Sequence, residues 1–475
     1  MPGAVARTAG PGGFAMIKLF DHYFHAWTLG RIGSDFGLSL LALMAIVLVQ
    51  ADSLWQALPL AGGPVMSLAA GLLVINSASG LYRRSMDWSV VASAWRAVLA
   101  VALSAMLAYQ ILGLLPAGHA NLEAVRLSST VVIIALILRR VALGYWATRS
   151  RVGTRVLVFG AGSAAQLVGS SLRAFDPSSN IVGYFPGPNE GQATVPLAER
   201  LSTGLSLTRT ARGLGADEIV VALTERRGGS MPLRELLDCK LAGIRVLDIS
   251  TYFERTLGQI RIDFVNAGWL IFGDGFSQGW LRSIVKRMFD LLCSSLLIVL
   301  ASPLMLVAAI AIKLDSAGPV FYRQQRVGAH NKVFQVTKFR SMRTDAEKDG
   351  KPRWAAAQDD RITRVGQLIR RLRIDELPQL FNVLAGSMSL VGPRPERPFF
   401  VEQLVVEIPY YAVRHSIKPG VTGWAQVRYQ YGSTVEDSQE KLQYDLYYVK
   451  NHSLLLDVLI LFQTVGVVLT GKGAR

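Results

Sequence analysis

Four long apolar stretches fill the first third of this 475-residue chain and constrain its fold more than any other feature. Each is close to the roughly 20 residues that a helix needs to cross the hydrocarbon core of a bilayer. A long polar and glycine-rich lead precedes the first stretch, which argues against a cleavable signal peptide. A soluble bundle of four buried helices is the less favoured alternative. We therefore predict a cytoplasmic segment over 1–33 and a four-helix transmembrane bundle over 34–148, with spans at 36–54, 60–81, 90–115 and 125–143.

Positive charge predicts how this bundle is oriented. Arg31 precedes the first stretch, Arg83-Arg84 separates the second from the third, and Arg149 follows the fourth. The loops on the other side, around Asp52 and over 116–123, contain no lysine or arginine. Because cytoplasmic loops are enriched in lysine and arginine, both ends of the bundle are expected in the cytoplasm.

Beyond the bundle, short apolar runs alternate with helical patterns over 149–250. This alternation is typical of a parallel α/β domain, here a Rossmann-like (CoA-binding-like) one. The first run leads into Gly160-Ala-Gly162, which resembles the phosphate-binding turn of dinucleotide sites. No acidic ribose partner closes the next run, so Gly160 and Gly162 are weak cofactor-binding candidates, and a regulatory or oligomeric role is favoured. The expected strands are 155–159, 181–185, 218–223 and 244–249.

A connector over 251–280 precedes a fifth apolar segment, 291–312, which has Ser302-Pro303 in its middle. Proline removes a backbone donor and breaks or kinks a helix. Lysine and arginine flank the segment on both sides, so both ends favour the cytoplasmic face. A straight crossing does not satisfy this pattern, and we predict a re-entrant helix over 284–314.

The net charge of +16, from 50 Lys+Arg against 34 Asp+Glu, suits an anionic membrane face, a phosphorylated substrate or nucleic acid. No nucleic-acid motif is present, so we expect no nucleic-acid partner. Two cysteines cannot build a disulfide framework, and the six histidines are scattered, which excludes a structural metal cluster.

The chemistry is concentrated in the last third of the chain. Five arginines and no carboxylate lie in 361–373, at a spacing that predicts an amphipathic helix with a cationic face. Asp375-Glu376 follows and opens a predicted helix that ends at Gly386, with Asp375 as its N-cap. Such a pair is usually only a cap and an ion-pair partner. Here two further basic motifs, around Lys338 and Arg394, favour phosphate binding, and carboxylates among them can hold Mg²⁺ or attack phosphorus.

Four motifs in this order resemble the bacterial sugar transferase family, the monotopic polyprenyl-phosphate phosphoglycosyl transferases. They are 338–342 (KFRSM), 375–386, 389–396 (SLVGPRPE) and 418–426 (KPGVTGWAQ). The resemblance covers about 282–475 and implies a mixed, mainly α catalytic domain over 281–475. The bundle and the α/β domain resemble the family's long form, and 252–276 is similar to members associated with exosortase-type polysaccharide clusters.

The resemblance implies transfer of hexose-1-phosphate, glucose favoured, from a UDP-sugar to undecaprenyl phosphate, with release of UMP. Asp375 matches the nucleophile of a covalent phosphosugar-aspartate intermediate, and Glu376 its dyad partner and Mg²⁺ ligand. The remaining carry-overs are contacts to phosphate, made by Lys338, Arg340, Arg370 and Arg394.

The implied setting is the first membrane step of exopolysaccharide or O-antigen-type synthesis. We expect a multi-pass protein of the bacterial inner membrane, in contact with the lipid bilayer, whose catalytic domain faces the cytoplasm. The sequence leaves the sugar and homo-oligomerisation open. A membrane-anchored nucleotide-sugar dehydratase or epimerase is an alternative, but it requires Tyr-x-x-x-Lys, which is absent. A non-enzymatic assembly scaffold does not account for the dyad.

Overall fold

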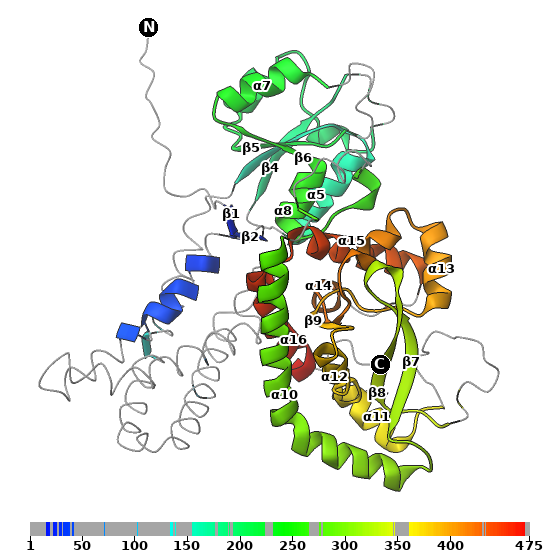
Figure 1. Ribbon diagram of the computed structural model, residues 1–475. Coiled ribbons are helices and arrows are strands. Elements are labelled where there is room, and N and C mark those ends of the chain that lie inside the picture. Colours follow the sequence, from blue (N-terminus) through cyan, green and yellow to red (C-terminus); the bar gives the residue numbers. More distant parts are fainter. Residues whose placement is uncertain are drawn as a thin grey trace, which may run out of the picture. The chain divides into compact units, whose positions relative to one another are not determined.

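The computed structural model in Figure 1 describes most of the chain after Arg155 and little before it. The predicted spans, the loops between them and the orientation of the bundle lie outside the described residues, apart from isolated positions. The chain divides into two compact units, one ending at Leu257 and the other beginning at Gly258. The described residues are 154–175, 179–188, 190, 193–223, 231–265, 275–276, 279–344, 346, 361–429, 432 and 434–470, with short pieces at 16–19, 22–25, 28–30, 32–38 and 40–41 and single positions 71, 102, 134, 135 and 138.

The first unit contains a four-stranded, fully parallel sheet in the order β4-β3-β5-β6. This confirms the predicted parallel α/β domain, and the strand bounds agree within two residues. Helices cross over between successive strands, as parallel pairing requires. The elements are β3 (Arg155–Phe159), α5 (Ser163–Phe175), β4 (Asn180–Phe185), η2 (Leu197–Glu199), α6 (Leu207–Gly213), β5 (Glu218–Val221), α7 (Leu233–Leu241), β6 (Arg245–Asp248) and α8 (Ile249–Leu257).

Both faces of this sheet are covered. Leu157 and Phe159 of β3 pack with Leu236 of α7 and Leu207 of α6 in one buried cluster. The intervening Val158 is equally buried, because α5 and α8 contact β3 and β5. Strands that are buried on both faces are continuously apolar, which is why the sequence marked them clearly.

The glycine turn after β3 is filled by a carboxylate of the chain itself. Glu190 accepts hydrogen bonds from the amides of Ala161, at 2.8 and 2.9 Å, Gly162, at 3.1 Å, and Gly187, at 3.0 Å. A Cβ at Gly160 would lie 2.6 Å from the carbonyl oxygen of Ala222 and 3.0 Å from Glu190 Oε1. The glycines therefore serve a close approach of backbone, and the amides that could hold a phosphate hold Glu190.

The second unit is a mixed α/β structure built on one long helix. Its strands form an antiparallel hairpin, β7–β8, and a short parallel pair, β9–β10. The elements are η3 (Ile262–Phe264), α10 (Trp280–Asp315), β7 (Phe321–Val327), η4 (Ala329–Asn331), β8 (Val333–Phe339), α11 (Arg364–Arg371), η5 (Ile374–Glu376), α12 (Gln379–Leu384), β9 (Ser389–Val391), α13 (Pro398–Glu407), η6 (Tyr411–Ser416), β10 (Gly420–Thr422), α14 (Trp424–Arg428), α15 (Val435–Asn451) and α16 (Leu454–Thr470). A separate pair, β1 (Met16–Leu19) and β2 (His22–His25), lies near the N-terminus.

Helix α10 is the one described helix long and apolar enough to cross a membrane, judged by length and composition. It is continuous through Pro303, and its two halves run in different directions (Figure 1). Pro303 cannot donate to the carbonyl of Val299, and the Ser302 hydroxyl donates to that oxygen instead, at 2.8 Å. The predicted break is thus a bend in one helix.

The segment expected as a connector is divided between the units. α8 packs in the α/β unit, whereas Ile260 and Ile262 are buried in the core of the second unit with Trp424 and Tyr447. The second unit therefore begins more than twenty residues before 281.

Candidate active site

The Asp375-Glu376 dyad lies in a tight turn between two helices. α11 ends at Arg371, and Arg373 adopts the left-handed conformation, with φ 59°. The dyad forms the 3₁₀ turn η5, and α12 starts only at Gln379, after Pro378. The prediction of Asp375 as the N-cap of a 375–386 helix is therefore wrong, because the 3₁₀ turn already begins at Ile374, with the left-handed Arg373 as its cap. Gly386, with φ +84°, does follow the helix end as predicted.

Two clamps fix the position of this segment. Arg287 of α10 donates to the carbonyls of Val383, at 2.6 Å, and Leu384, at 2.8 Å, so it caps the C-terminal end of α12. Asn382 donates to the carbonyl of Gln335 and accepts from the amide of Thr337, at 2.7 and 3.0 Å. The dyad is thereby tied both to the apolar helix and to the strand that carries Lys338.

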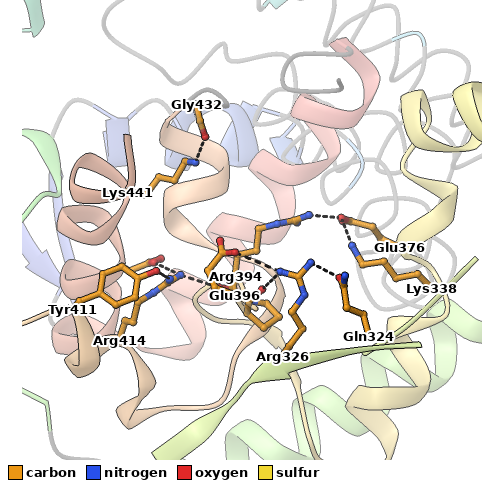
Figure 2. A network of polar contacts seen from close by, with 12 residues as sticks. Gln324, Arg326, Lys338, Glu376, Arg394, Glu396, Tyr411, Arg414, Gly432 and Lys441 are labelled. Atoms are coloured by element: carbon orange, nitrogen blue, oxygen red, sulfur yellow. Dashed lines mark hydrogen bonds and ion pairs between the residues drawn. The ribbon is translucent and has the colours of Figure 1, made fainter. Parts of the chain in front are cut away.

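Three cations surround one oxygen of Glu376. Its Oε1 lies 2.8 Å from Arg394 Nη2, 3.4 Å from Lys338 Nζ and 3.6 Å from an Arg373 nitrogen. Figure 2 shows Lys338 and Arg394 pointing at this carboxylate from opposite sides. Glu376 is 8% exposed, so the cations offset much of the cost of burying its charge.

The two carboxyl groups of the dyad differ in their protonation. Burial raises the pKa of Glu376, but Arg394, Lys338 and Arg373 outweigh it and hold this pKa well below its usual range. Burial and then the Glu376 charge raise the pKa of Asp375 to about 6, against the opposing effects of Lys338, Arg370 and Arg373. Within the described residues, Asp375 has no ion pair. One carboxylate is thus neutralised by its neighbours, and the other stays available near neutral pH.

The other predicted site residues divide into two groups. Arg370, in the last turn of α11, is close enough to lower the pKa of Asp375, so it belongs to the site. Arg340 instead donates to the carbonyls of Ala317 and Ser316, at 2.8 and 2.7 Å, and to the Ser316 hydroxyl. Its guanidinium thus holds the end of α10, and the predicted contact of Arg340 to phosphate stays a prediction.

Several residues around the site were not predicted from sequence patterns. Arg373 was part of a predicted cationic run without a role of its own, although its position beside the dyad was a usable signal. Arg287, Asn382, Arg326 and Arg414 act through contacts to distant backbone, which no local pattern marks.

The donor set of the dyad is compatible with Mg²⁺ only in part. Two adjacent carboxylates supply the hard oxygens that Mg²⁺ prefers. Within the described residues no group of three or more Asp, Glu, His or Cys side chains could hold a metal ion. Three cations already face Glu376, so a resident Mg²⁺ would be repelled. The residues fit an Mg²⁺ that shares its ligands with the phosphates of a substrate.

Taken together, these groups can bind and react with a phosphate ester. Lys338, Arg370 and Arg394 offer donors close to the dyad, where partial burial makes charge-assisted hydrogen bonds strong. Asp375 offers beside them a carboxylate that has no ion pair in the described part of the chain. This combination suits attack on phosphorus with stabilisation of the developing charge.

Comparison with known proteins agrees with this geometry. Residues 281–471 match the family model described as bacterial sugar transferase. The chain is 47% identical over 242 residues to the UDP-N-acetylgalactosamine-undecaprenyl-phosphate N-acetylgalactosaminephosphotransferase of Aeromonas hydrophila, covering 51% of this chain and 56% of that protein. It is 45% identical over 263 residues to the UDP-glucose:undecaprenyl-phosphate glucose-1-phosphate transferase of Klebsiella pneumoniae, covering 54% and 56%.

A protein of the same name from Caulobacter vibrioides is 46% identical over 193 residues, which is 40% of this chain and 71% of that protein. The chain spans about half the length of the first two relatives. The family match over 281–471 contains the dyad and every cation placed around it. The alignment with the Caulobacter protein covers more than two thirds of that protein. The chain therefore belongs to the bacterial sugar transferase family.

Proposed function

We propose that this protein transfers a hexose-1-phosphate from a UDP-hexose to undecaprenyl phosphate and releases UMP. The observation that carries the proposal is the difference in ion pairing between Glu376 and Asp375. Glu376 is neutralised by three cations, while Asp375, which has no ion pair within the described residues, lies next to cationic side chains. The names of the relatives support the same reaction class.

The reaction takes two displacements at one phosphorus. An Asp375 carboxylate oxygen attacks the phosphorus that carries the sugar, the bond from that phosphorus to the bridging oxygen breaks, and UMP leaves with the electron pair. A phosphate oxygen of undecaprenyl phosphate then attacks the same phosphorus and releases the Asp375 carboxylate. Both nucleophiles are anions, so neither step requires a proton acceptor.

The cations of the site account for the stabilisation of charge. Arg394, Lys338 and Arg370 bind non-bridging oxygens of the transferred phosphate, and Arg373 keeps Glu376 ionised. When bound with the diphosphate, Mg²⁺ would be held by Glu376 and would neutralise charge on the leaving UMP.

The identity of the hexose is a narrower proposal. We favour glucose and keep N-acetylgalactosamine as the alternative, because relatives of similar identity carry each name. The two sugars differ at C2, where N-acetylgalactosamine carries an acetamido group in place of a hydroxyl, and in the configuration of the C4 hydroxyl.

The proposed location is the cytoplasmic face of a bacterial inner membrane. Large apolar side chains along α10 are exposed, including Leu292, Val299, Leu300 and Leu306 at 63–69%. A surface of this kind is covered by lipid or by protein. We propose that α10 is re-entrant in the bilayer and that the dyad lies at the level where a lipid phosphate is presented.

The test uses membranes that contain the full chain, undecaprenyl phosphate and a panel of UDP-sugars, with UMP release as the readout. We expect release with one UDP-hexose, its loss in Asp375→Asn, and an adduct heavier by one hexose phosphate on the Asp375 peptide when the lipid is omitted. Asp238→Asn, an exposed aspartate of α7, is the matched control. An adduct on another residue, or UMP release by Asp375→Asn, would overturn the proposal.

A further inference from the structure

The loop that presents Arg394 is held through its backbone carbonyls. Its two prolines, Pro393 and Pro395, have no amide hydrogen, so the carbonyls are the groups by which the main chain can be anchored. Four consecutive carbonyl oxygens each accept from a different donor, on three separate elements: Pro393 from the Gly420 amide at 2.9 Å, Arg394 from Arg414 Nη2 at 2.8 Å, Pro395 from Arg326 Nη1 at 3.1 Å and Glu396 from the Val327 amide at 2.9 Å.

Among these donors, Arg414 holds the carbonyl of the residue whose side chain contacts Glu376. Its guanidinium is 6% exposed and binds three groups at once. Nη2 lies 2.7 Å from Asp445 Oδ2 and donates to the Arg394 carbonyl, and Nη1 donates to the Tyr411 hydroxyl at 2.7 Å. Figure 2 shows Arg414 and Tyr411 on the far side of Arg394 from Glu376.

A buried ion pair of this kind is a weak source of stability. Taking Arg414 and Asp445 out of water costs about as much as their attraction returns, and an apolar pair of equal volume often serves as well. What an apolar pair cannot supply is a fixed donor aimed at the Arg394 carbonyl. A planar guanidinium that is anchored on two sides directs its third bond with little freedom.

We infer that Arg414, with Asp445 as its buried counter-ion, is a positioning residue for Arg394. It acts on the transferred phosphate only through that residue. The inference rests on the proposed function, because it assigns Arg394 to substrate phosphate. The path runs from Asp445 on α15, through Arg414 on η6, to the Arg394 backbone and then to Glu376.

A double-mutant cycle separates positioning from general support of the fold. Arg414→Met and Arg414→Lys are each made in the native chain and in the Arg394→Ala chain, and kcat/KM for the UDP-sugar is measured by UMP release. Arg414→Met should lower kcat/KM by roughly 10–100-fold, the range seen when a partner that orients a liganding side chain is lost. In the Arg394→Ala chain the same change should have little further effect, because residues that act as one unit are not additive.

Arg414→Lys keeps the ion pair with Asp445 but carries one nitrogen, which cannot serve three separated acceptors. Its melting temperature should be close to that of the native chain. Its loss of kcat/KM should nevertheless be nearly as large as that of Arg414→Met. If Arg414→Met fails to fold, the cycle with Arg414→Lys decides. The control is Arg255→Met, which breaks a matched buried pair with Glu218 at 2.7 Å in the α/β unit. It should lower the melting temperature without coupling to Arg394.

The affinity for UDP, measured on the same variants, gives a readout that needs no turnover. Arg414→Lys and Arg394→Ala should weaken UDP binding by similar factors, and the double variant should bind no worse than Arg394→Ala alone. Equal losses of kcat/KM or of UDP affinity in both backgrounds would overturn the inference. A native chain that binds UDP with this coupling but releases no UMP would overturn the proposed function and leave the positioning role supported.

Discussion

The indole Nε1 of Trp424 donates a hydrogen bond to the carbonyl oxygen of Gly258 over 2.8 Å. Trp424 is fully buried beside Tyr447, and Gly258 is held with φ +64° against the indole ring. The amide of Ile260 also donates to the carbonyl of Gln443, at 3.0 Å. The catalytic unit therefore includes residues that precede both the family match and the apolar helix.

Truncation should expose this dependence. A chain that starts at Gly258 should keep transferase activity and a melting temperature near that of the native catalytic unit. A chain that starts at Leu281 retains every residue assigned to chemistry but loses the buried Ile260 and Ile262 and the Gly258 carbonyl that accepts from Trp424 Nε1. Since each large buried side chain contributes roughly 1.5–3 kcal/mol, it should melt several degrees lower. Equal melting temperatures for the two truncated chains would contradict this account.

The rate of UMP release should depend on pH through Asp375. Burial and then Glu376 raise the pKa of Asp375 to about 6, and in the proposed reaction only the ionised carboxylate attacks phosphorus. Below pH 6 the rate should fall about tenfold per pH unit. Arg370 opposes the shift, so Arg370→Gln should move the acidic limb to higher pH. Arg371→Gln, one residue along the same helix, is the control and should leave the limb in place.

The raised pKa of Asp375 also makes the stability of the fold depend on pH, in the direction opposite to that of the rate. A carboxyl whose pKa is higher in the folded state than in the unfolded state stabilises the fold at low pH, and this contribution is lost as the pH rises through about 6. Asp375→Asn removes the unfavourable charge, so the inactive variant should melt higher than the native chain at pH 8. The advantage should vanish near pH 4. A lower melting temperature at pH 8 would show that Asp375 has a stabilising partner.

Mg²⁺ should bind together with the nucleotide and not before it. Three cations face Glu376, and the described residues offer no cluster of three metal-binding side chains. Calorimetry should show no binding of Mg²⁺ alone, and tighter binding of UDP when Mg²⁺ is present. Glu376→Gln should abolish this gain, whereas Glu402→Gln, an exposed glutamate of α13, should keep it. Tight binding of Mg²⁺ without nucleotide would contradict the prediction.

The parallel sheet could be predicted because its signal is local. The central strands β3 and β5 are buried on both faces and read as apolar runs, and the edge strands β4 and β6 repeat the spacing, so the predicted bounds agree within two residues. The dyad was found for a similar reason, since Asp375 and Glu376 are adjacent and follow a run of arginines. The turn that contains them was not predicted, because Pro378 is compatible both with the start of a helix and with a turn that precedes it. In the structure the left-handed Arg373 starts a separate 3₁₀ turn before the helix.

The supporting contacts could not be predicted, because they join distant parts of the chain. Arg414 and the Arg394 carbonyl are 20 residues apart, and Arg326 and the Pro395 carbonyl are 69 apart. An acceptor on the backbone leaves no mark in the sequence. Glu190 illustrates the same limit, since it lies 28 residues after the glycine turn that it fills.

Removing Glu190 should open the glycine turn. Glu190→Ala leaves the amides of Ala161, Gly162 and Gly187 without their acceptor, which should destabilise the α/β unit by roughly 1–3 kcal/mol. Inorganic phosphate should then restore part of the melting temperature, because it can take the place of the carboxylate at the start of α5. Glu199→Ala breaks an exposed pair with Arg173 and should change little. Stabilisation of the native chain by a dinucleotide would show that Glu190 leaves the turn.

The bend of α10 should set the side of the membrane on which the catalytic unit lies. Its two ends carry Arg282 and Lys313, and its two halves run in different directions (Figure 1). The Ser302 hydroxyl donates to the Val299 carbonyl, which Pro303 leaves without a backbone donor. Undecaprenyl phosphate and UDP-sugars meet at the cytoplasmic interface, so the proposed reaction requires both ends of α10 on that face. Cysteines at Arg282 and Lys313 should both be labelled from the cytoplasm.

Replacing Ser302 and Pro303 with leucine should favour a straight crossing, because each leucine near the middle of a span lowers the insertion cost by several tenths of a kcal/mol. In that variant the Lys313 site should become accessible from the periplasm and UMP release should be lost. Periplasmic labelling of the Lys313 site in the native chain would refute the re-entrant arrangement.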